Sequence, residues 1–385
     1  MHLRSLAQLS VSEHHLLQGS SPGETFGSLD ALGREDARVE GPVGSNYLLR
    51  AAAWEAYGNT ALSSLYSNLQ EQHHRHEVNT PDLHQSACRR AIKMANIGDR
   101  QAVFQIFERL RSGAPVSPEW KTWATTFGDI LLAICLDRGE YKNAEVLLSS
   151  LQGMASTPQA ALASKVEQAV FLSDQGRHQE AYARLQEGMA ESHTIVVAPS
   201  VEVEALLRTA EVFMNCQQPL SALPYILKAL TLSDQYYLSE TMTGTLLLLA
   251  EVLLHFDLGE QSRALVEDLL PHVSAQGVAK QRGRLHLVLA KYHLASTPPA
   301  LAAALRELGL CADLFAVSGS QSLLAETFYL QARINHDLGN IEERDRAAKA
   351  FRERTQQISR GANAGASPDV RYFHLDGRQE TFVGR

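Results

Sequence analysis

Two short segments of the chain carry residue types that could do chemistry. Residues 19–23 read Gly-Ser-Ser-Pro-Gly and match the G-x-S-x-G pattern of a serine nucleophile. Such a nucleophile needs a strand before it and a helix after it, but here polar loop sequence flanks both sides. His73, His74 and His76 form the densest histidine cluster, with His84 further on, and histidines three apart can share a helix face and bind a metal. The stretch is polar throughout, so a solvent-exposed helix end is the preferred interpretation.

The remaining sequence offers no further constellation for catalysis. It lacks the phosphate-binding motifs G-x-x-x-x-G-K-S/T and G-x-G-x-x-G, and it lacks the metal-binding motif H-E-x-x-H. Trp120 and Trp123 lie three apart near an expected helix start, a spacing that favours core residues over an exposed binding hot spot. We therefore predict no catalytic, cofactor-binding or metal-binding residues and no enzymatic activity. The alternative hypothesis is an enzyme whose active-site residues cannot be recognised from the sequence motifs.

The composition narrows the possible partners. The 385 residues carry a formal net charge of −8 and a pI of about 6.0, whereas a nucleic-acid-binding protein needs a concentrated positive surface. The strongest apolar stretch, Thr245–Phe256, is interrupted by Glu251 and is shorter than the ~20 residues of a membrane span. We expect no nucleic acid, no membrane and no small-molecule substrate as partner.

The cysteines indicate a reducing compartment. No two of Cys88, Cys135, Cys216 and Cys311 lie within 40 residues of each other, so neither a CxxC pair nor a compact disulfide framework is present. Each lies in an apolar helical pattern, where a thiol behaves as a small hydrophobic group. We expect the protein in the nucleus and cytoplasm.

One local pattern recurs along the chain at intervals near 40 residues. A small residue ends a helix, a short turn follows, and an alanine opens the next helix about five residues later. Gly139 with Ala144, and Gly176 with Ala181, are the clearest copies. The turns are spaced by 41, 37, 41 and 42 residues, and then by 80 for two units. This period, with two helices per unit, is typical of a helical solenoid, and about seven units fit the chain.

The residue types in this pattern follow from helix packing. Glycine accepts the left-handed conformation that ends a helix, and alanine lets the preceding helix cross closely. The first helices carry large residues spaced as in tetratricopeptide repeats, although the units are longer than usual. We predict an all-α, tetratricopeptide-like solenoid of helical hairpins. The residues expected to pack the repeats are Trp54, Tyr57, Gly58, Gly98, Ala102, Gly128, Gly139, Tyr141, Ala144, Gly176, Ala181, Ala222, Ala229, Gly259, Ala264 and Gly339.

The predicted domain organisation has four parts. Residues 1–17 show leucines at helical spacing and are expected to form an N-terminal helix. Residues 18–45 are rich in Gly, Ser and Pro and are predicted to be a flexible loop. The repeat domain covers 46–359, and 360–385 are predicted to be a flexible tail.

Two Ser-Pro dipeptides lie in the segments that are predicted to be flexible. Ser21 and Ser367 are the serines, and a proline-directed kinase could reach either of them. Phosphate there would add charge without unfolding a packed element. Phosphorylation at these two serines is therefore a hypothesis of the sequence.

The helix around Trp54 resembles a known family. Residues 45–58 read Ser-Asn-Tyr-Leu-Leu-Arg-Ala-Ala-Ala-Trp-Glu-Ala-Tyr-Gly, which is similar to a stretch of the subunit 5 family of the anaphase-promoting complex (cyclosome), especially its fungal members. The order that follows is also similar: a hairpin near Gly98, a segment containing Trp120, and then Gly139 with Ala144. The family has a helical domain and earlier repeats that this chain mostly lacks, so the resemblance is to its C-terminal tetratricopeptide region.

The resemblance implies a non-catalytic scaffold subunit of a cell-cycle E3 ubiquitin ligase. Its partners would be the other protein subunits, held through helical-repeat interfaces, while the ligase chemistry would belong to other chains. The alternative is a generic tetratricopeptide adaptor that binds a peptide or partner protein in its concave groove. The predicted groove shows no regular basic ladder, which favours a large protein interface over capture of a carboxylate.

Overall fold

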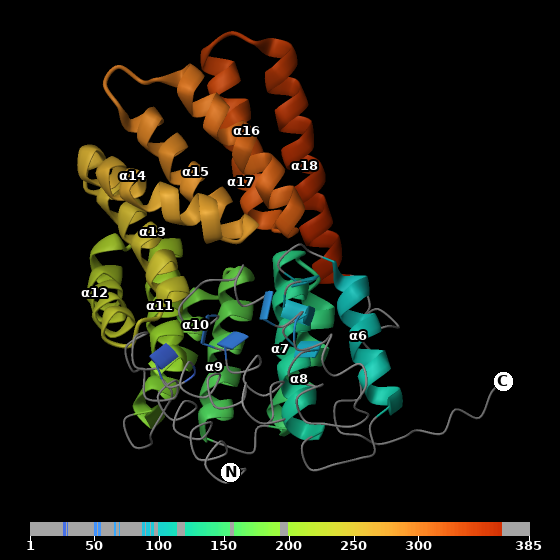
Figure 1. Cartoon of the computed structure of the whole chain (residues 1–385). Coiled ribbons are helices and arrows are strands. Elements are labelled where there is room, and N and C mark those ends of the chain that lie inside the picture. Colours follow the sequence, from blue (N-terminus) through green and yellow to red (C-terminus); the bar gives the residue numbers. More distant parts are fainter. Residues whose placement is uncertain are drawn as a thin grey trace, which may run out of the picture.

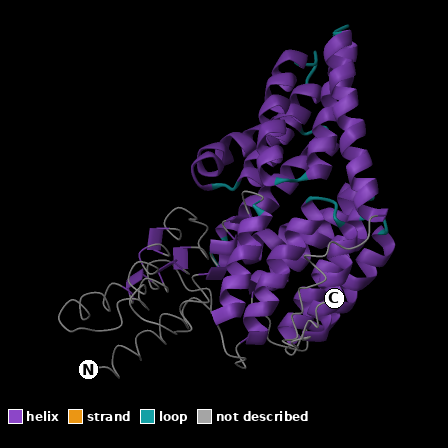
Figure 2. Ribbon diagram, turned by 90° about the vertical axis from the view of Figure 1, so that its right-hand side faces the viewer, coloured by secondary structure: helices purple, strands orange, loops and turns teal. Residues whose placement is uncertain are grey.

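In a computed structural model, the chain is described over residues 99–113, 120–154, 158–192 and 199–363, with scattered helical residues between 26 and 95. Every regular element within these ranges is an α-helix (Figure 2), which confirms the all-α prediction. None of the described helices is both long and apolar enough to cross a membrane. The helices named here are α6 (Arg100–Gly113), α7 (Trp120–Asp137), α8 (Tyr141–Met154), α9 (Pro158–Asp174), α10 (His178–Ser192), α11 (Pro199–Asn215), α12 (Pro219–Gln235), α13 (Ser239–His255), α14 (Gly259–Gln276), α15 (Ala279–Ala295), α16 (Leu301–Ser318), α17 (Gln321–Asp337) and α18 (Ile341–Asn363).

The helices pair into antiparallel hairpins through one recurring turn. In the α7–α8 turn, Gly139 has a φ of 68°. Its N–H donates to the carbonyl of Leu136, and the next N–H, of Glu140, donates to the carbonyl of Cys135 at 2.8 Å. These two bonds satisfy carbonyls that the end of a helix leaves without partners. The same pair of bonds closes the α9–α10 turn at Gly176 and the α17–α18 turn at Gly339.

Three described turns use residues other than glycine at the left-handed position: Tyr237 between α12 and α13, and two residues in turns within hairpins. Gln217 in the α11–α12 turn has a φ of 59°, and Asp257 in the α13–α14 turn has a φ of 58°. The predicted turn glycine of the second, Gly259, is instead the first residue of α14. The predicted turn is two residues too late, because the left-handed residue that ends the helix is Asp257 and not a glycine.

Small buried residues five positions after four of the hairpin turns allow the paired helices to cross closely. Ala144, Ala181 and Ala222 are fully buried at these crossings. In the α13–α14 hairpin the equivalent position is Ser262, which is also fully buried and donates its hydroxyl to the Ala250 carbonyl at 2.8 Å. The structure therefore corrects the expectation for Ala264, which is exposed because the register of that unit is shifted by two residues.

Two domain boundaries differ from those expected. Phe26 and Leu29, within the predicted loop 18–45, are helical. Leu29 is fully buried, and the Phe26 ring lies 4.2 Å from the Trp54 ring between centroids. At the other end, α18 continues to Asn363, four residues beyond residue 359. The first difference arises where a few apolar residues pack despite Gly- and Ser-rich surroundings.

The hairpins stack into one turn of a superhelix that closes on itself. In Figure 1 the long final helix α18 descends from the upper hairpins to reach the lower tier of α7 and α8. Ile358 of α18 belongs to the same apolar cluster as Phe127 and Leu131 of α7 and Leu147 of α8. The last described helix thus packs against the first complete hairpin, and the inner surface forms a groove.

Candidate functional site

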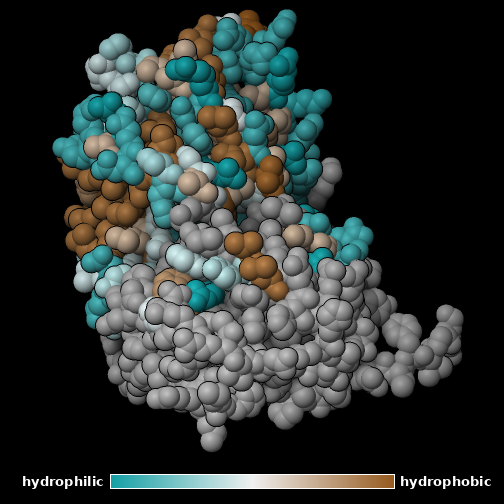
Figure 3. Space-filling view, in the orientation of Figure 1, coloured by the Kyte–Doolittle hydropathy of each residue, from teal (hydrophilic) through white to brown (hydrophobic). Residues whose placement is uncertain are grey.

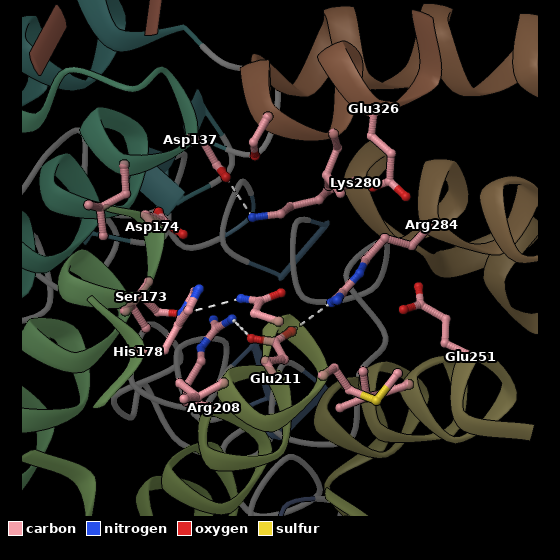
Figure 4. A pocket seen from close by; sticks show the side chains of 18 of the residues that line it. Asp137, Ser173, Asp174, His178, Arg208, Glu211, Glu251, Lys280, Arg284 and Glu326 are labelled. Atoms are coloured by element: carbon pink, nitrogen blue, oxygen red, sulfur yellow. Dashed lines mark hydrogen bonds and ion pairs between the residues drawn. The ribbon is translucent and has the colours of Figure 1, made fainter. Parts of the chain in front are cut away.

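The inner surface of the superhelical turn forms the main candidate site. Side chains from α7, α9, α11, α13, α15 and α17, the first helices of successive hairpins, surround a cavity of about 700 Å³. Cavities of this size are typical of sites for small ligands or short peptides. Such sites are mostly apolar, whereas this one includes ten charged side chains, which come from several helices (Figure 4).

Helical spacing brings these charges to one side of each helix. Lys280, Arg284 and Lys291 lie at i, i+4 and i+11 on α15, so they project from the same face. Glu167 and Asp174 lie seven residues apart on α9, again on one face. The opposite faces of these helices carry the apolar residues that pack the solenoid, so the polar face is directed into the groove.

Three charged residues from two helices form the centre of the groove. Arg208 donates to Glu211 with 2.7 Å between Nη1 and Oε2, and Arg284 donates to the other oxygen of Glu211 at 3.0 Å. Arg208 also lies 2.8 Å from Glu204. Burial alone would raise the pKa of Glu211, but the two arginines outweigh this effect and lower it to about 2. Glu211 is therefore firmly ionised and joins α11 to α15.

Two further ion pairs occupy the α15 side of the groove. Lys280 Nζ lies 2.6 Å from Asp137 Oδ1 of α7, across 143 residues of sequence. Lys291 Nζ lies 3.0 Å from Glu326 Oε1 of α17. Both pairs join helices of different hairpins, so the charges also connect distant parts of the solenoid.

Three groove carboxylates, Glu167, Asp174 and Glu251, make no ion pair with any residue that the structure describes. Burial raises the pKa of Glu167 to about 7; Arg208 opposes this shift, and Glu204 and Asp129 add to it. Burial likewise raises the pKa of Asp174 to about 6, although its side chain is exposed to the interior of the groove. The protein around the groove displaces part of the water that would solvate the ionised carboxylates, so ionisation of Glu167 and Asp174 is disfavoured.

A serine and a histidine lie together at the edge of the groove, but they do not form a catalytic pair. Ser173 Oγ lies 3.3 Å from His178 Nδ1, and Asn215 Nδ2 donates to the same hydroxyl at 3.2 Å. A general base needs a third group that orients its second ring nitrogen. Among the residues with described positions, no carboxylate bonds to His178 in that way. These bonds tie the α9–α10 turn to the end of α11.

Metal binding has no support in the described part of the chain. There, no three His, Cys, Asp or Glu side chains come close enough together to hold an ion. The predicted histidine cluster at 73–84 lies outside the described residues, as do the G-x-S-x-G segment, Ser21 and Ser367.

Most of the described residues that were predicted to pack the repeats lie at turns and helix crossings, and Gly176 also lines the groove. Gly176 and Gly339 are exposed at their turns, whereas Trp54 and Ala102 are half-buried. Tyr57, Gly58 and Gly98 lie outside the described residues. The buried ones are Gly128, Gly139, Tyr141, Ala144, Ala181, Ala222 and Ala229.

The sequence did not reveal the charged groove itself. One signal was present: Glu251 interrupts the apolar stretch Thr245–Phe256, and the structure places it in the groove wall. Charged residues inside otherwise apolar first helices could have marked this face. Which charges pair could not be read from sequence, because the partners lie on different hairpins.

Comparison with known proteins agrees with the resemblance. No family model matches the chain. The human protein named anaphase-promoting complex subunit 5 is 25% identical over 326 residues, which covers 80% of this chain and 42% of the human protein. The mouse protein of that name is 24% identical over 332 residues. The chain thus spans about two fifths of the length of the curated relatives it matches, and the resemblance to subunit 5 is confirmed.

Solved structures support the fold. A Rap protein complexed with competence and sporulation factor superposes with a TM-score of 0.62 at 10% identity, covering 93% of this chain and 99% of that one. NprR in complex with its cognate peptide gives a TM-score of 0.58 at 11% identity, covering 92% and 98%. These likenesses concern the fold alone.

Proposed function

We propose that this chain, like the subunit 5 proteins it resembles, is a non-catalytic scaffold subunit of the anaphase-promoting complex, a cell-cycle E3 ubiquitin ligase. The observation that carries the proposal is the similarity to subunit 5 from several vertebrates, which extends over 80% of this chain for the human protein. In this role the chain holds other subunits through its helical-repeat surfaces, in the nucleus and cytoplasm.

The outer surface suits such a role. Apolar side chains gather at the left edge of the molecule in Figure 3, near α12 and α13. On α12, Leu220 and Leu227 are 70% and 51% exposed. Contiguous exposed apolar surface is typical of a protein interface. No assembled catalytic constellation competes with this interpretation in the described residues.

A test of the proposal measures ubiquitin transfer. The tagged chain is purified from dividing cells together with its bound partners, and the recombinant chain is prepared alone. We expect the partner-bound preparation to transfer ubiquitin in the presence of activating and conjugating enzymes, and we expect the chain alone to transfer none. Transfer by the chain alone, or an inactive preparation lacking ligase subunits, would contradict the proposal.

A second candidate function is a peptide-binding adaptor, favoured by the groove cavity of about 700 Å³. The similar fold of NprR was solved with its cognate peptide bound. The two candidates are compatible, because a scaffold subunit can also receive a segment of a partner in its groove.

A further inference from the structure

The basic residues of the groove all have ion-pair partners, whereas some of its carboxylates have none among the described residues. Its lining includes six carboxylates and four Lys or Arg side chains. All four basic side chains already pair with carboxylates: Arg208 and Arg284 with Glu211, Lys280 with Asp137, and Lys291 with Glu326. The groove therefore has little capacity for an anion, and the unmatched charge is negative.

Three of the six carboxylates make no ion pair with a described residue: Glu167 and Asp174 of α9, and Glu251 of α13. Glu251 acts electrostatically on both Arg284 and Lys291 and raises the pKa of each, so the carboxylates that most lack a cation are Glu167 and Asp174. Glu167 faces Arg208, Glu204, Asp129 and Lys280, and Asp174 faces Lys280, Asp137, Arg208 and Glu211. Around each carboxylate, the negative charge of the neighbouring acids offsets the positive charge of the neighbouring Lys and Arg residues. Those Lys and Arg residues are also already in ion pairs with other carboxylates. A cation placed beside the half-buried Glu167 would gain a partner with less competing water than at the outer surface, and a cation beside Asp174 would gain one that is open to the groove.

The geometry points to a segment of a partner protein that carries two basic residues as the occupant of this groove. This inference rests on the proposed protein-binding role and names the chemistry of what the groove receives: one ammonium or guanidinium group at Glu167 and another at Asp174. A metal ion fits poorly, because the described acids do not converge on one point. A planar guanidinium can bond both oxygens of a carboxylate, so arginine suits the site best.

The spacing of the two carboxylates sets the spacing of the basic residues. Seven residues of α-helix place Glu167 and Asp174 about 10 Å apart along the α9 axis. An extended peptide advances about 3.3 Å per residue, so basic residues three positions apart would match. A cavity of about 700 Å³ accommodates a short extended segment of this kind.

The pH dependence of binding follows from the same groups. Because their pKa values are raised to about 7 and about 6, Glu167 and Asp174 take up protons as the pH falls below neutral. A cationic segment must displace those protons. Binding should therefore release protons and tighten as the pH rises through this range.

Calorimetry on the full 385-residue chain tests the inference. The probe is the peptide Ala-Arg-Ala-Ala-Arg-Ala with blocked termini, and the control peptide has citrulline in place of both arginines. We expect the arginine peptide to bind and the citrulline peptide to bind at least about tenfold more weakly, equivalent to about 1.4 kcal/mol. Equal binding of the two peptides, or no binding of the arginine peptide, would overturn the inference.

Matched variants locate the site. The double change Glu167→Gln with Asp174→Asn should weaken the arginine peptide at least about tenfold, whereas Glu267→Gln on the exposed part of α14 should leave binding unchanged. Equal losses in both variants would overturn the inference. If the double variant does not fold, the wild-type chain decides: binding that does not tighten between about pH 5.5 and about pH 8 overturns it. Failure here is distinct from failure of the scaffold role, which is judged by co-purifying ligase subunits.

Discussion

Asp137 and Lys280 form an ion pair of 2.6 Å across 143 residues of sequence. It joins α7, in the first complete hairpin, to α15, far along the solenoid. On the outside of the same turn, a Cβ built on Gly139 would lie 3.2 Å from Ile358 Cγ1 of α18. An ion pair inside and an apolar contact outside thus close the superhelical turn around the groove.

Gly139→Ala should disturb this closure more than Gly176→Ala. Both glycines have positive φ, at 68° and 76°, so each alanine should cost about 1–2 kcal/mol of unfolding free energy. Only at Gly139 does the added methyl group also press on α18, because nothing lies within 4 Å of the equivalent position at Gly176. Chemical denaturation and proteolysis near α18 measure the two effects. Equal losses in both variants would show that α18 does not pack on Gly139.

Glu211→Gln should destabilise the protein most near neutral pH. The pKa of Glu211 is lowered from 4.5 to about 2 in the folded state, so its contribution is complete above 4.5 and is lost as the pH falls toward 2. The change leaves Arg208 and Arg284 without this partner, and we expect a loss of about 2 kcal/mol, less than for a fully buried pair because water still reaches both arginines. Urea unfolding at several pH values checks the loss. A difference between wild type and variant that does not shrink in acid would contradict the assignment.

Glu167→Gln should change stability with the opposite dependence on pH. Because the folded-state pKa of Glu167 is raised from 4.5 to about 7, ionisation is disfavoured in the folded protein, and the wild type loses stability as the pH rises through that window. The variant should therefore gain stability relative to wild type between acid and slightly alkaline pH. Thermal unfolding across the window measures this, with Glu267→Gln as the exposed control. A variant that is destabilised most at alkaline pH would show that Glu167 has a counter-ion.

Ala181→Trp should disrupt the α9–α10 crossing. Ala181 is fully buried, and an indole there overfills the space between the two helices, at a cost of about 1–3 kcal/mol or more. Ala183, two residues later, is exposed, so Ala183→Trp is the matched control. Melting temperatures compare the two variants. If they melt alike, the register assigned to this hairpin is wrong.

The repeat could be predicted from sequence because its signals are local. A glycine at the left-handed position and a buried alanine five residues later follow from the backbone of a single hairpin, and Gly139 with Ala144 shows both. The pattern failed where another residue takes the left-handed position. Asp257 ends the α13–α14 turn with a φ of 58°, so the search for glycine moved that turn to Gly259.

The groove could not be predicted because its geometry depends on the whole solenoid. The Asp137–Lys280 pair requires the curvature accumulated over several hairpins, which small rotations between neighbouring units determine. Burial raises the pKa of Glu167 on α9, whereas Arg208 and Arg284 outweigh burial and lower the pKa of Glu211 on the neighbouring helix α11. Sequence spacing indicates which residues share a helix face. It does not indicate which residues of other helices lie opposite that face across the groove.

The most direct test of the scaffold role is the composition of the complex that the chain enters. The tagged chain is purified from dividing cells, and the co-purifying proteins are identified and counted by mass spectrometry. The account predicts a cullin-like subunit, a RING subunit and other tetratricopeptide subunits in a fixed ratio to the tagged chain. Recovery of the chain alone, or with a single short-motif partner, would contradict the account and leave the peptide-binding adaptor as the better description.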